Sequence, residues 1–309
     1  MKNILILGGT GFIGRNILEE LEGGDYNIFL LSRRKDLTSL VSKRINVVQG
    51  SLKDTDLIES IISNHDIEIL LHLASNLIPS SSKSQFEEEI NNIVLPTFKL
   101  LSFISRKNIK LIYFSSGGAI YGKAEGKINE KNECEPINYH GHSKLLIETH
   151  VKLLNKTDNL KYLILRPSNV YGKYQRLQSR QGFIAVALGR ILSNQDIEIW
   201  GDGNTIRDYV DVSDISRVVR ILIEDNIENK IFNLGSGEGH SLIRVVDLLE
   251  NQLKKSANII YQDKREVDLD RLVLDISSIE SFVDYKPQKL EEGIKSFISH
   301  LKLTKNNGK

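Results

Sequence analysis

The chain of 309 residues contains a single cysteine, Cys134, among 41 basic and 40 acidic residues. One cysteine cannot form an internal disulfide bond, which is typical of a protein from a reducing compartment. No spacing of a zinc site is found, so no metal is expected. Because the formal net charge is only +1, the chain lacks the basic excess that favours a nucleic-acid partner.

Long hydrophobic runs are also absent, since no stretch of about 18 apolar residues, the length that spans a membrane, occurs in the sequence. The first aliphatic run, residues 4–7, is too short for the apolar region of a signal peptide. We therefore expect a cytoplasmic protein with no membrane partner. Its length suits one large or two modest domains with a core that needs no disulfides.

Short aliphatic segments alternate with amphipathic ones in the first half of the chain. The aliphatic segments predict strands with two apolar faces, at residues 4–7, 28–31, 45–48, 69–73, 111–114 and 162–165. The segments between them predict helices at residues 12–21, 54–63, 95–105 and 143–154. Strands buried on both faces and separated by helices predict an α/β fold with a doubly wound parallel sheet.

A glycine-rich loop follows the first predicted strand directly and opens the first predicted helix. Its glycines satisfy a dinucleotide-binding pattern, in which they permit a tight turn and a close approach of the backbone to the pyrophosphate. The helix N-terminus then stabilises the phosphate charge. We predict a Rossmann-type cofactor site, rather than a purely structural turn, at Gly8, Gly9, Thr10, Gly11, Phe12, Ile13 and Gly14.

The end of the second predicted strand bears on the choice between NAD and NADP(H). NAD binding usually requires a carboxylate there, whereas the 2′-phosphate of NADP favours arginine. Ser32 stands at the position of the acid and is followed by Arg33 and Arg34. These cations are either solvated loop charges or a clamp for the 2′-phosphate. Because the carboxylate is missing, we favour the clamp and predict NADP(H), with NAD as the alternative.

The alternation of strands and helices ends after about Arg166, where clusters of Gly, Asp and Asn begin. We expect residues 1–166 to form the cofactor-binding domain that carries the catalytic residues. Residues 167–301 would form a smaller α/β part that binds the substrate and from which the chain re-enters the sheet. The polar residues 302–309 would be a frayed tail.

Several further motifs occur in the order of a known family. They are His72-Leu73-Ala74, Ser115-Ser116-Gly117-Gly118-Ala119-Ile120-Tyr121-Gly122, Ser143-Lys144, Leu165-Arg166-Pro167-Ser168-Asn169-Val170-Tyr171-Gly172, Gly201-Asp202-Gly203 and Arg207-Asp208-Tyr209-Val210. With them the chain resembles the extended short-chain dehydrogenases/reductases, specifically the NAD(P)-dependent nucleotide-sugar epimerase/dehydratase/reductase family and its UDP-glucose 4-epimerase-like members. The resemblance implies cofactor contacts at Ser51, Leu52, Leu73, Ala74, Lys144 and Pro167.

The resemblance also implies a catalytic pair, in which a Tyr and a Lys four residues later share one helix face. The Tyr exchanges a proton with the sugar, and the Lys grips the nicotinamide ribose and lowers the pKa of the phenol. The residue four before Lys144 is His140, and Tyr139 precedes it. We predict His140 as the proton donor. Tyr139 would act only if the helix began later or were distorted, and a third alternative is that neither acts.

Two other positions depart from the family pattern. Gly117 stands where the family usually has Ser or Thr, and Ser116, one residue earlier, is the candidate that polarises the oxygen at sugar carbon 4, unless it only caps a strand end. Ser51 replaces an Asp that often holds the adenine amino group, and it makes that contact less selectively. This departure argues against a permanently bound cofactor.

The substrate implied by the resemblance is a nucleotide sugar. Asn169 matches an asparagine near its diphosphate, and Arg207 and Arg265 match two arginines that clamp it. Paired guanidinium groups suit the charge and geometry of a diphosphate. Asp268 follows Arg265 in the same motif, where it usually orients an arginine. Any of these residues taken alone would read as a surface or capping residue.

Three functions fit these residues. We favour an NADP(H)-dependent reductase that delivers hydride to the carbon-4 ketone of a nucleotide-linked 4-keto-6-deoxy sugar, because a histidine with a reference pKa of about 6.5 donates a proton at neutral pH more readily than it removes one from an alcohol. The alternative is a UDP-hexose 4-epimerase with bound NAD. The third is a catalytically weakened NADP-binding sensor or scaffold, which only the missing Tyr supports.

The resemblance also implies a biosynthetic role and an oligomeric state. Members of the family often serve activated-sugar synthesis for a surface polysaccharide. They often form homodimers through two long helices, which would here be residues 95–105 and 143–154.

Overall fold

The computed structural model describes residues 1–34, 37, 42, 45–123, 126–179, 181–264 and 269–306. The chain divides into two compact units. The first comprises Met1–Ile120, Cys134–Arg166 and Ser216–Phe232, and the second comprises Tyr121–Glu133, Pro167–Ile215 and Asn233–Lys309. This division differs from a single boundary at Arg166, because one early segment joins the second unit and one late segment returns to the first.

The first unit is built on a sheet with the strand order β10-β6-β5-β4-β1-β2-β3. Its strands are β1 (Lys2–Leu7), β2 (Tyr26–Ser32), β3 (Ile45–Gln49), β4 (Ile69–His72), β5 (Lys110–Phe114), β6 (Tyr162–Pro167) and β10 (Lys230–Leu234). Every neighbouring pair from β3 to β6 is parallel. Each strand expected from the aliphatic segments is present, and the Rossmann-type fold class is confirmed.

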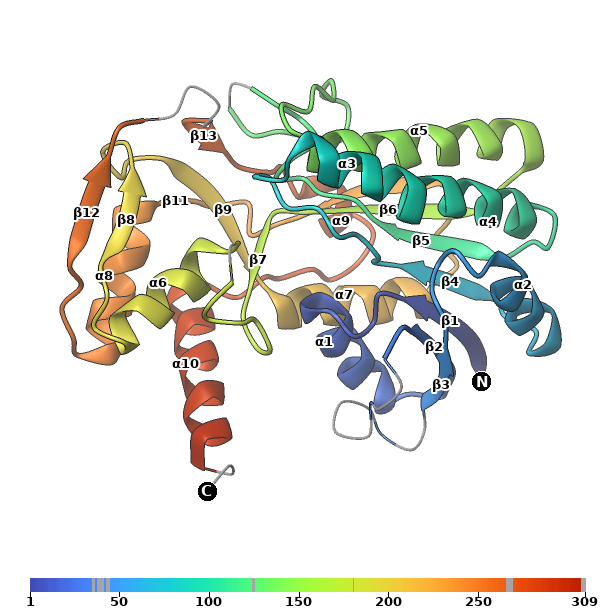
Figure 1. Ribbon diagram of the computed structural model, residues 1–309, viewed down its shortest axis with the longest axis horizontal. Helices are drawn as coiled ribbons and strands as arrows, with labels where there is room; N and C mark the ends of the chain where they lie inside the picture. The colour runs from blue at the N-terminus through green and yellow to red at the C-terminus, as the bar shows by residue number, and fades with distance from the viewer. Residues whose placement is uncertain are drawn as a thin grey trace. The chain divides into compact units, whose positions relative to one another are not determined.

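Helices cover both faces of this sheet, which explains why its strands are aliphatic on both sides. The helices are α1 (Phe12–Glu22), α2 (Thr55–Asn64), α3 (Lys83–Glu89), the π-helical segment η1 (Ile90–Val94), α4 (Leu95–Ser105), α5 (Tyr139–Asp158) and α7 (Val212–Glu224). Figure 1 shows α3, α4 and α5 on one face and α1 and α7 on the other. Leu5, Leu70 and Leu111 of the strands form a buried core with Ile58, Leu101 and Ile147 of α2, α4 and α5.

The second unit combines small sheets with helices. The strands β7 (Asn169–Tyr171), β9 (Ile206–Asp211), β11 (Gly239–Ser241) and β13 (Arg271–Leu272) form one sheet around β9, and β8 (Ile197–Trp200) pairs with β12 (Ile259–Gln262). The helices are α6 (Phe183–Leu192), α8 (Leu242–Leu253), α9 (Ser277–Glu280) and α10 (Leu290–Asn306). Helix α10 continues to Asn306, past the start of the tail at residue 302, and the fraying of residues 302–309 stays a prediction.

No helix within the described parts of the chain is both long and apolar enough to cross a membrane.

Candidate active site

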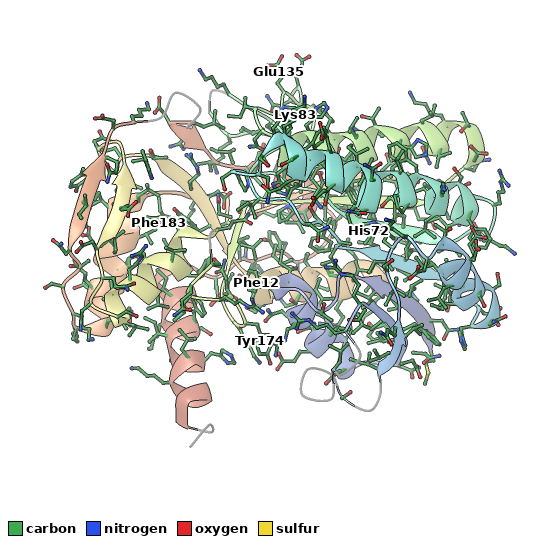
Figure 2. The ribbon with its side chains drawn as sticks, in the orientation of Figure 1. Phe12, His72, Lys83, Glu135, Tyr174 and Phe183 are labelled. Carbon is green, nitrogen blue, oxygen red and sulfur yellow. The ribbon has the colours of Figure 1, made fainter. Side chains whose placement is uncertain are left out.

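The carboxyl ends of the parallel strands meet at one edge of the main sheet, which is where open α/β sheets bind ligands. Leu7 at the end of β1 is in register with His72 at the end of β4, and His72 is in register with Tyr113 of β5. Figure 2 labels His72 and also Phe12, the residue at which α1 begins after β1. The loops after these strands therefore leave from the same edge.

The glycine loop after β1 has the close packing that a pyrophosphate site requires. Gly8 has a φ of 84°, in the left-handed region that favours glycine, and a Cβ at this position would lie 2.8 Å from the Ala74 nitrogen. A Cβ on Gly14 would lie 2.5 Å from the Gly9 Cα. Gly11 is the N-cap of α1, and no side chain of the described residues caps this end. The first N–H groups of α1 are thus left for a phosphate.

A cavity of about 470 Å³ in the first unit is lined by this loop, a volume typical of small-molecule sites. Of the predicted cofactor residues, those that line it are Gly8, Thr10, Gly11, Ser32, Arg33, Ser51, Leu52, Leu73 and Ala74. Those that do not line it are Gly9, Phe12, Ile13, Gly14, Arg34, Lys144 and Pro167. The open helix end, the glycine cradle and the lining residues together fit a dinucleotide.

Four residues with polar side chains line the cavity but were not predicted to do so: Lys53, Ser75, Asn76 and Asn92. Lys53 follows Ser51 and Leu52 at the end of β3, and Ser75 and Asn76 follow Ala74 at the end of β4. Because these three residues directly follow predicted cofactor contacts in the sequence, they could have been predicted from their position. Asn92 had no such signal, because it lies within η1 and a π-helical turn does not show in the apolar pattern.

One end of the cavity, at β2 and β3, is positively charged. Arg33 and Lys53 line it, and no carboxylate does among the described lining residues. The Ser32 Oγ accepts a hydrogen bond of 3.1 Å from the Arg34 nitrogen, which shapes the turn after β2. The Ser51 Oγ accepts from the Lys53 nitrogen at 3.2 Å. Lys35, which follows the two arginines, lies outside the described residues.

Helix α5 determines where His140 and Tyr139 lie. It begins at Tyr139 because the Asn138 Oδ1 accepts from the Gly141 nitrogen at 2.9 Å and so caps the first turn. His140 and Lys144, four residues apart on this helix, are only 8% and 5% exposed. Tyr139 is 37% exposed and stacks on Phe86, with ring centroids 5.0 Å apart. The helix therefore places His140, and not Tyr139, in the buried environment of Lys144.

Burial depresses the pKa of both members of this pair. The Lys144 Nζ donates a 2.8 Å hydrogen bond to the Phe114 carbonyl at the end of β5. Burial lowers the pKa of Lys144 to about 8, an effect that Glu89 and Glu148 oppose. Burial, together with the charge of Lys144, lowers the pKa of His140 to about 3.

The histidine is therefore a neutral imidazole at neutral pH, and the reference value of about 6.5, on which the argument for proton donation rested, does not apply to this buried side chain. Its Nδ1 is buried and has no hydrogen-bond partner among the described residues. A neutral imidazole offers one N–H donor and one acceptor nitrogen, whereas its protonated form would offer two donors.

The loop with Ser116 meets α5 at a glycine. A Cβ on Gly141 would lie 2.1 Å from the Ala119 carbonyl oxygen, so only glycine permits this approach. The Ser116 carbonyl accepts from the Ala119 and Ile120 nitrogens at 3.3 and 3.2 Å, which folds residues 116–120 into a turn. Ser116 is half-buried and Gly117 is buried. The close approach of this turn to α5 brings the segment of Ser116 to the segment of His140.

Asn169 and Arg207, the predicted substrate residues of the second unit within the described chain, lie on the paired strands β7 and β9. The Asn169 Nδ2, at the start of β7, donates to the Asp208 carbonyl at 2.9 Å, and Arg207 precedes Asp208 on β9. The buried Asp208 carboxylate accepts from Ser168 Oγ at 3.1 Å and from the backbone nitrogens of Ser236 and Gly237 at 2.7 and 3.2 Å.

Asp208 is a buried carboxylate that the sequence patterns did not single out, although it stands next to Arg207 in the motif Arg207-Asp208-Tyr209-Val210. Burial raises the pKa of its carboxyl, against the hydrogen bonds from Ser236. Arg265 and Asp268 lie outside the described residues.

These features define a class of protein. A cavity that fits a dinucleotide and a buried His–Lys pair lie in the same Rossmann-type unit, at the edge where such sheets bind cofactors. The class is that of dinucleotide-dependent α/β enzymes.

Comparison with known proteins defines the family. The model of the NAD dependent epimerase/dehydratase family matches residues 4–235. A protein of Methanocaldococcus jannaschii, inferred to be a UDP-glucose 4-epimerase, is 33% identical over 308 residues, which cover 97% of this chain and 98% of that protein. The chain belongs to this NAD-dependent epimerase/dehydratase family, and the predicted family is confirmed.

Two further proteins are similar over nearly the whole chain. The dTDP-4-dehydro-6-deoxyglucose reductase of Escherichia coli is 29% identical over 309 residues, covering 97% of this chain and 98% of that protein. The crystal structure of a UDP-glucose 4-epimerase from Thermotoga maritima with UDP-glucose has a TM-score of 0.91 at 28% identity, covering 98% of this chain and 99% of that one. The protein is thus an enzyme of a family with both epimerase and reductase members.

Proposed function

We propose that this protein is an NADP(H)-dependent reductase that converts the carbon-4 ketone of a nucleotide-linked 4-keto-6-deoxy sugar to an alcohol. The observation that carries the proposal is the charged end of the cavity, where Arg33 and Lys53 stand with Ser32 and no carboxylate appears among the described lining residues. A 2′-phosphate suits two cations, whereas a ribose hydroxyl would suit an acid. When bound, the dinucleotide supplies the hydride for carbon 4.

The residues of the first unit have separate roles in this proposal. Lys144, held on the Phe114 carbonyl, binds the nicotinamide ribose with its ammonium group. His140 donates its neutral N–H to the ketone oxygen and so polarises the carbonyl, as neutral imidazoles do in other enzymes. Ser116 is the second donor to that oxygen. Lys144, whose pKa of about 8 is near the working pH, holds the proton that completes the alcohol.

The substrate would be held by residues of the second unit. The Arg207 guanidinium and the Asn169 amide suit the oxygens of a diphosphate, and the Asp208 carbonyl accepts a hydrogen bond from the Asn169 amide. The similarity to the Escherichia coli reductase, which acts on a dTDP-4-dehydro-6-deoxy sugar, supports this substrate class. Arg265 and Asp268 complete the proposed clamp, although they lie outside the described residues.

A UDP-hexose 4-epimerase with bound NAD is the second candidate. The 33% identity to the Methanocaldococcus jannaschii protein favours it. An epimerase must remove a proton from a sugar hydroxyl before it returns one, and because an imidazole with a pKa of about 3 is a weak base, that step would fall to Lys144 in its uncharged form. A sensor or scaffold is the third candidate, and the buried His140–Lys144 pair argues against it.

The deciding experiment is turnover of dTDP- and GDP-linked 4-keto-6-deoxy sugars with NADPH or NADH, followed by the absorbance of the reduced cofactor. We expect oxidation of NADPH in preference to NADH, and Arg33→Ala should remove most of that preference. Interconversion of UDP-glucose and UDP-galactose without added cofactor, and no oxidation of NADPH, would instead establish the epimerase.

The proposed reaction belongs to cytoplasmic synthesis of activated sugars for a surface polysaccharide. We also propose a homodimer formed through α4 and α5, on which Leu95 and Leu153 are 47% and 52% exposed. Light scattering should give twice the mass of 35.0 kDa, and a monomeric mass would refute the dimer.

A further inference from the structure

Glu89 at the end of α3 is an acidic side chain that is only 1% exposed. Its Oε1 accepts a hydrogen bond of 2.9 Å from the Ser75 Oγ. Its Oε2 accepts from the backbone nitrogen of Asn76 at 3.1 Å and from the Asn76 Nδ2 at 3.2 Å. A carboxylate is kept out of water only where such donors compensate it, so Glu89 is bound firmly to the loop after β4.

That loop forms part of the cofactor cavity. Ser75 and Asn76 both line it, together with Asn92 from η1, the π-helical segment that directly follows Glu89. A carboxylate only accepts hydrogen bonds, so the Asn76 side chain must turn its amide nitrogen toward Glu89. The Asn76 Oδ1 is then the atom that this side chain offers to a donor on a ligand.

We propose that Glu89 is a positioning residue for the dinucleotide, because its carboxylate fixes the Ser75–Asn76 wall of the cavity and the orientation of the Asn76 amide. The inference deepens the proposed function and rests on its dinucleotide site. It does not depend on which sugar is reduced, or on whether the enzyme is a reductase or an epimerase.

Glu89 also acts on the charge of Lys144. The charged groups that act on the pKa of Lys144 are Glu89 on α3 and Glu148 on α5, and Lys144 in turn lowers the pKa of His140 on α5 and of His72 on β4. The Lys144 Nζ lies 5.2 Å from the centre of the Tyr113 ring on β5. Glu89 is the largest of the influences that raise the pKa of Lys144 against burial. Loss of the Glu89 charge should therefore make Lys144 lose its proton at a lower pH.

The experiment measures the dissociation constants of NADPH and NADH by calorimetry, without sugar, between pH 6 and pH 9.5. Glu89→Gln keeps the shape of the side chain but removes its charge. At pH 7 we expect the variant to bind the preferred dinucleotide about tenfold more weakly, the effect of losing a hydrogen bond to a charged group. The affinity of Glu89→Gln for the dinucleotide should also begin to decline at a lower pH than that of the wild type, by about half a pH unit or more. Glu88→Gln, at the exposed neighbouring position, is the matched control and should behave as the wild type.

Two more variants keep the inference testable if Glu89→Gln does not fold. Glu89→Asp retains the charge, but its shorter side chain does not reach Ser75 and Asn76. This variant should bind the dinucleotide more weakly and keep the wild-type pH dependence of the affinity. Asn76→Ala changes an exposed residue and removes the positioned amide, and it should weaken binding by a similar factor. Wild-type affinity in Asn76→Ala, or in a folded Glu89→Gln across the pH range, would overturn the proposal. Because no sugar is present, a failed reductase assay leaves this result unaffected.

Discussion

His140 and Tyr139 are neighbours in the sequence but have opposite environments at the start of α5. His140 is buried with Lys144, whereas Tyr139 stacks on Phe86 near the surface. We expect His140→Phe to lower kcat at least about 100-fold, the usual contribution of a group that transfers or shares a proton, while NADPH binding persists. Tyr139→Phe should change kcat less than about twofold, because its ring stacking is retained.

The assay is turnover with the preferred sugar nucleotide, with cofactor affinity measured in parallel. A large loss in Tyr139→Phe and a small loss in His140→Phe would show that the tyrosine is the acting group.

Lys144 sets the expected pH dependence of the reaction. Its pKa of about 8 means that its ammonium group loses a proton above that pH, and we expect the neutral amine to bind the nicotinamide ribose more weakly. The pKa of His140, about 3, lies below the range in which the enzyme would be assayed. We expect kcat/KM to be level from about pH 6 and to fall above about pH 8.

This profile should be measured with a set of overlapping buffers at constant ionic strength. An inflection near pH 6.5 would mean that the pKa of His140 is close to the ordinary value for histidine, and that the imidazolium is the proton donor.

At the scale of elements, the strands of the main sheet other than β10, and four of its helices, follow from the sequence, because burial on both faces of a sheet imposes continuous aliphatic runs. The start of α5 does not follow from an apolar pattern, because polar Tyr139, His140 and His142 fill its first turn. The signal there is Asn138, a preferred N-cap residue that bonds to Gly141. Recognition of that cap would have placed both Tyr139 and His140 on the helix.

The buried acids Glu89 and Asp208 could not be predicted from the sequence for a different reason. Glu87, Glu88 and Glu89 read as one solvated acidic run, and only the third is buried. Its partners, Ser75 and Asn76, lie on another element, so no local pattern reveals the contact. Asp208 was missed for the same reason, since its donors come from distant loops. Buried acids with partners far along the chain are therefore the features that sequence patterns alone do not give.

The junction of α5 with the loop after β5 gives a prediction for Gly141. A Cβ there would lie 2.1 Å from the Ala119 oxygen, and a backbone atom cannot move aside cheaply. We expect Gly141→Ala to lower the free energy of unfolding by about 1–3 kcal/mol, as overpacking does, and to lower kcat because the segments of Ser116 and His140 move apart.

Urea unfolding and turnover provide the two measurements. Gly23→Ala is the matched control, because a Cβ at Gly23, the C-cap of α1, meets no atom within 4 Å. Equal stabilities for the two variants would show that the loop adapts to the added methyl group.

At the scale of the whole molecule, the fold keeps two histidines uncharged, at His72 and His140. Burial lowers the pKa of each to about 3, and the charge of Lys144 adds to the effect. In the unfolded chain each would titrate near pH 6.5, so between pH 6.5 and pH 3 the unfolded state binds more protons than the folded state. The contribution of these histidines to stability is therefore complete above pH 6.5 and is lost as the pH falls toward 3.

His72 allows this to be tested apart from the carboxylates, which titrate in the same range. Its Nε2 lies 2.9 Å from the Thr97 Oγ1, a contact that a glutamine amide can replace. Between pH 7 and pH 5 we expect the free energy of unfolding of His72→Gln to fall by about 2 kcal/mol less than that of the wild type. The measurement is urea unfolding at both pH values. Equal losses in the two proteins would mean that His72 is protonated in the folded state as readily as in the unfolded chain, and that the buried edge of the sheet admits a charge.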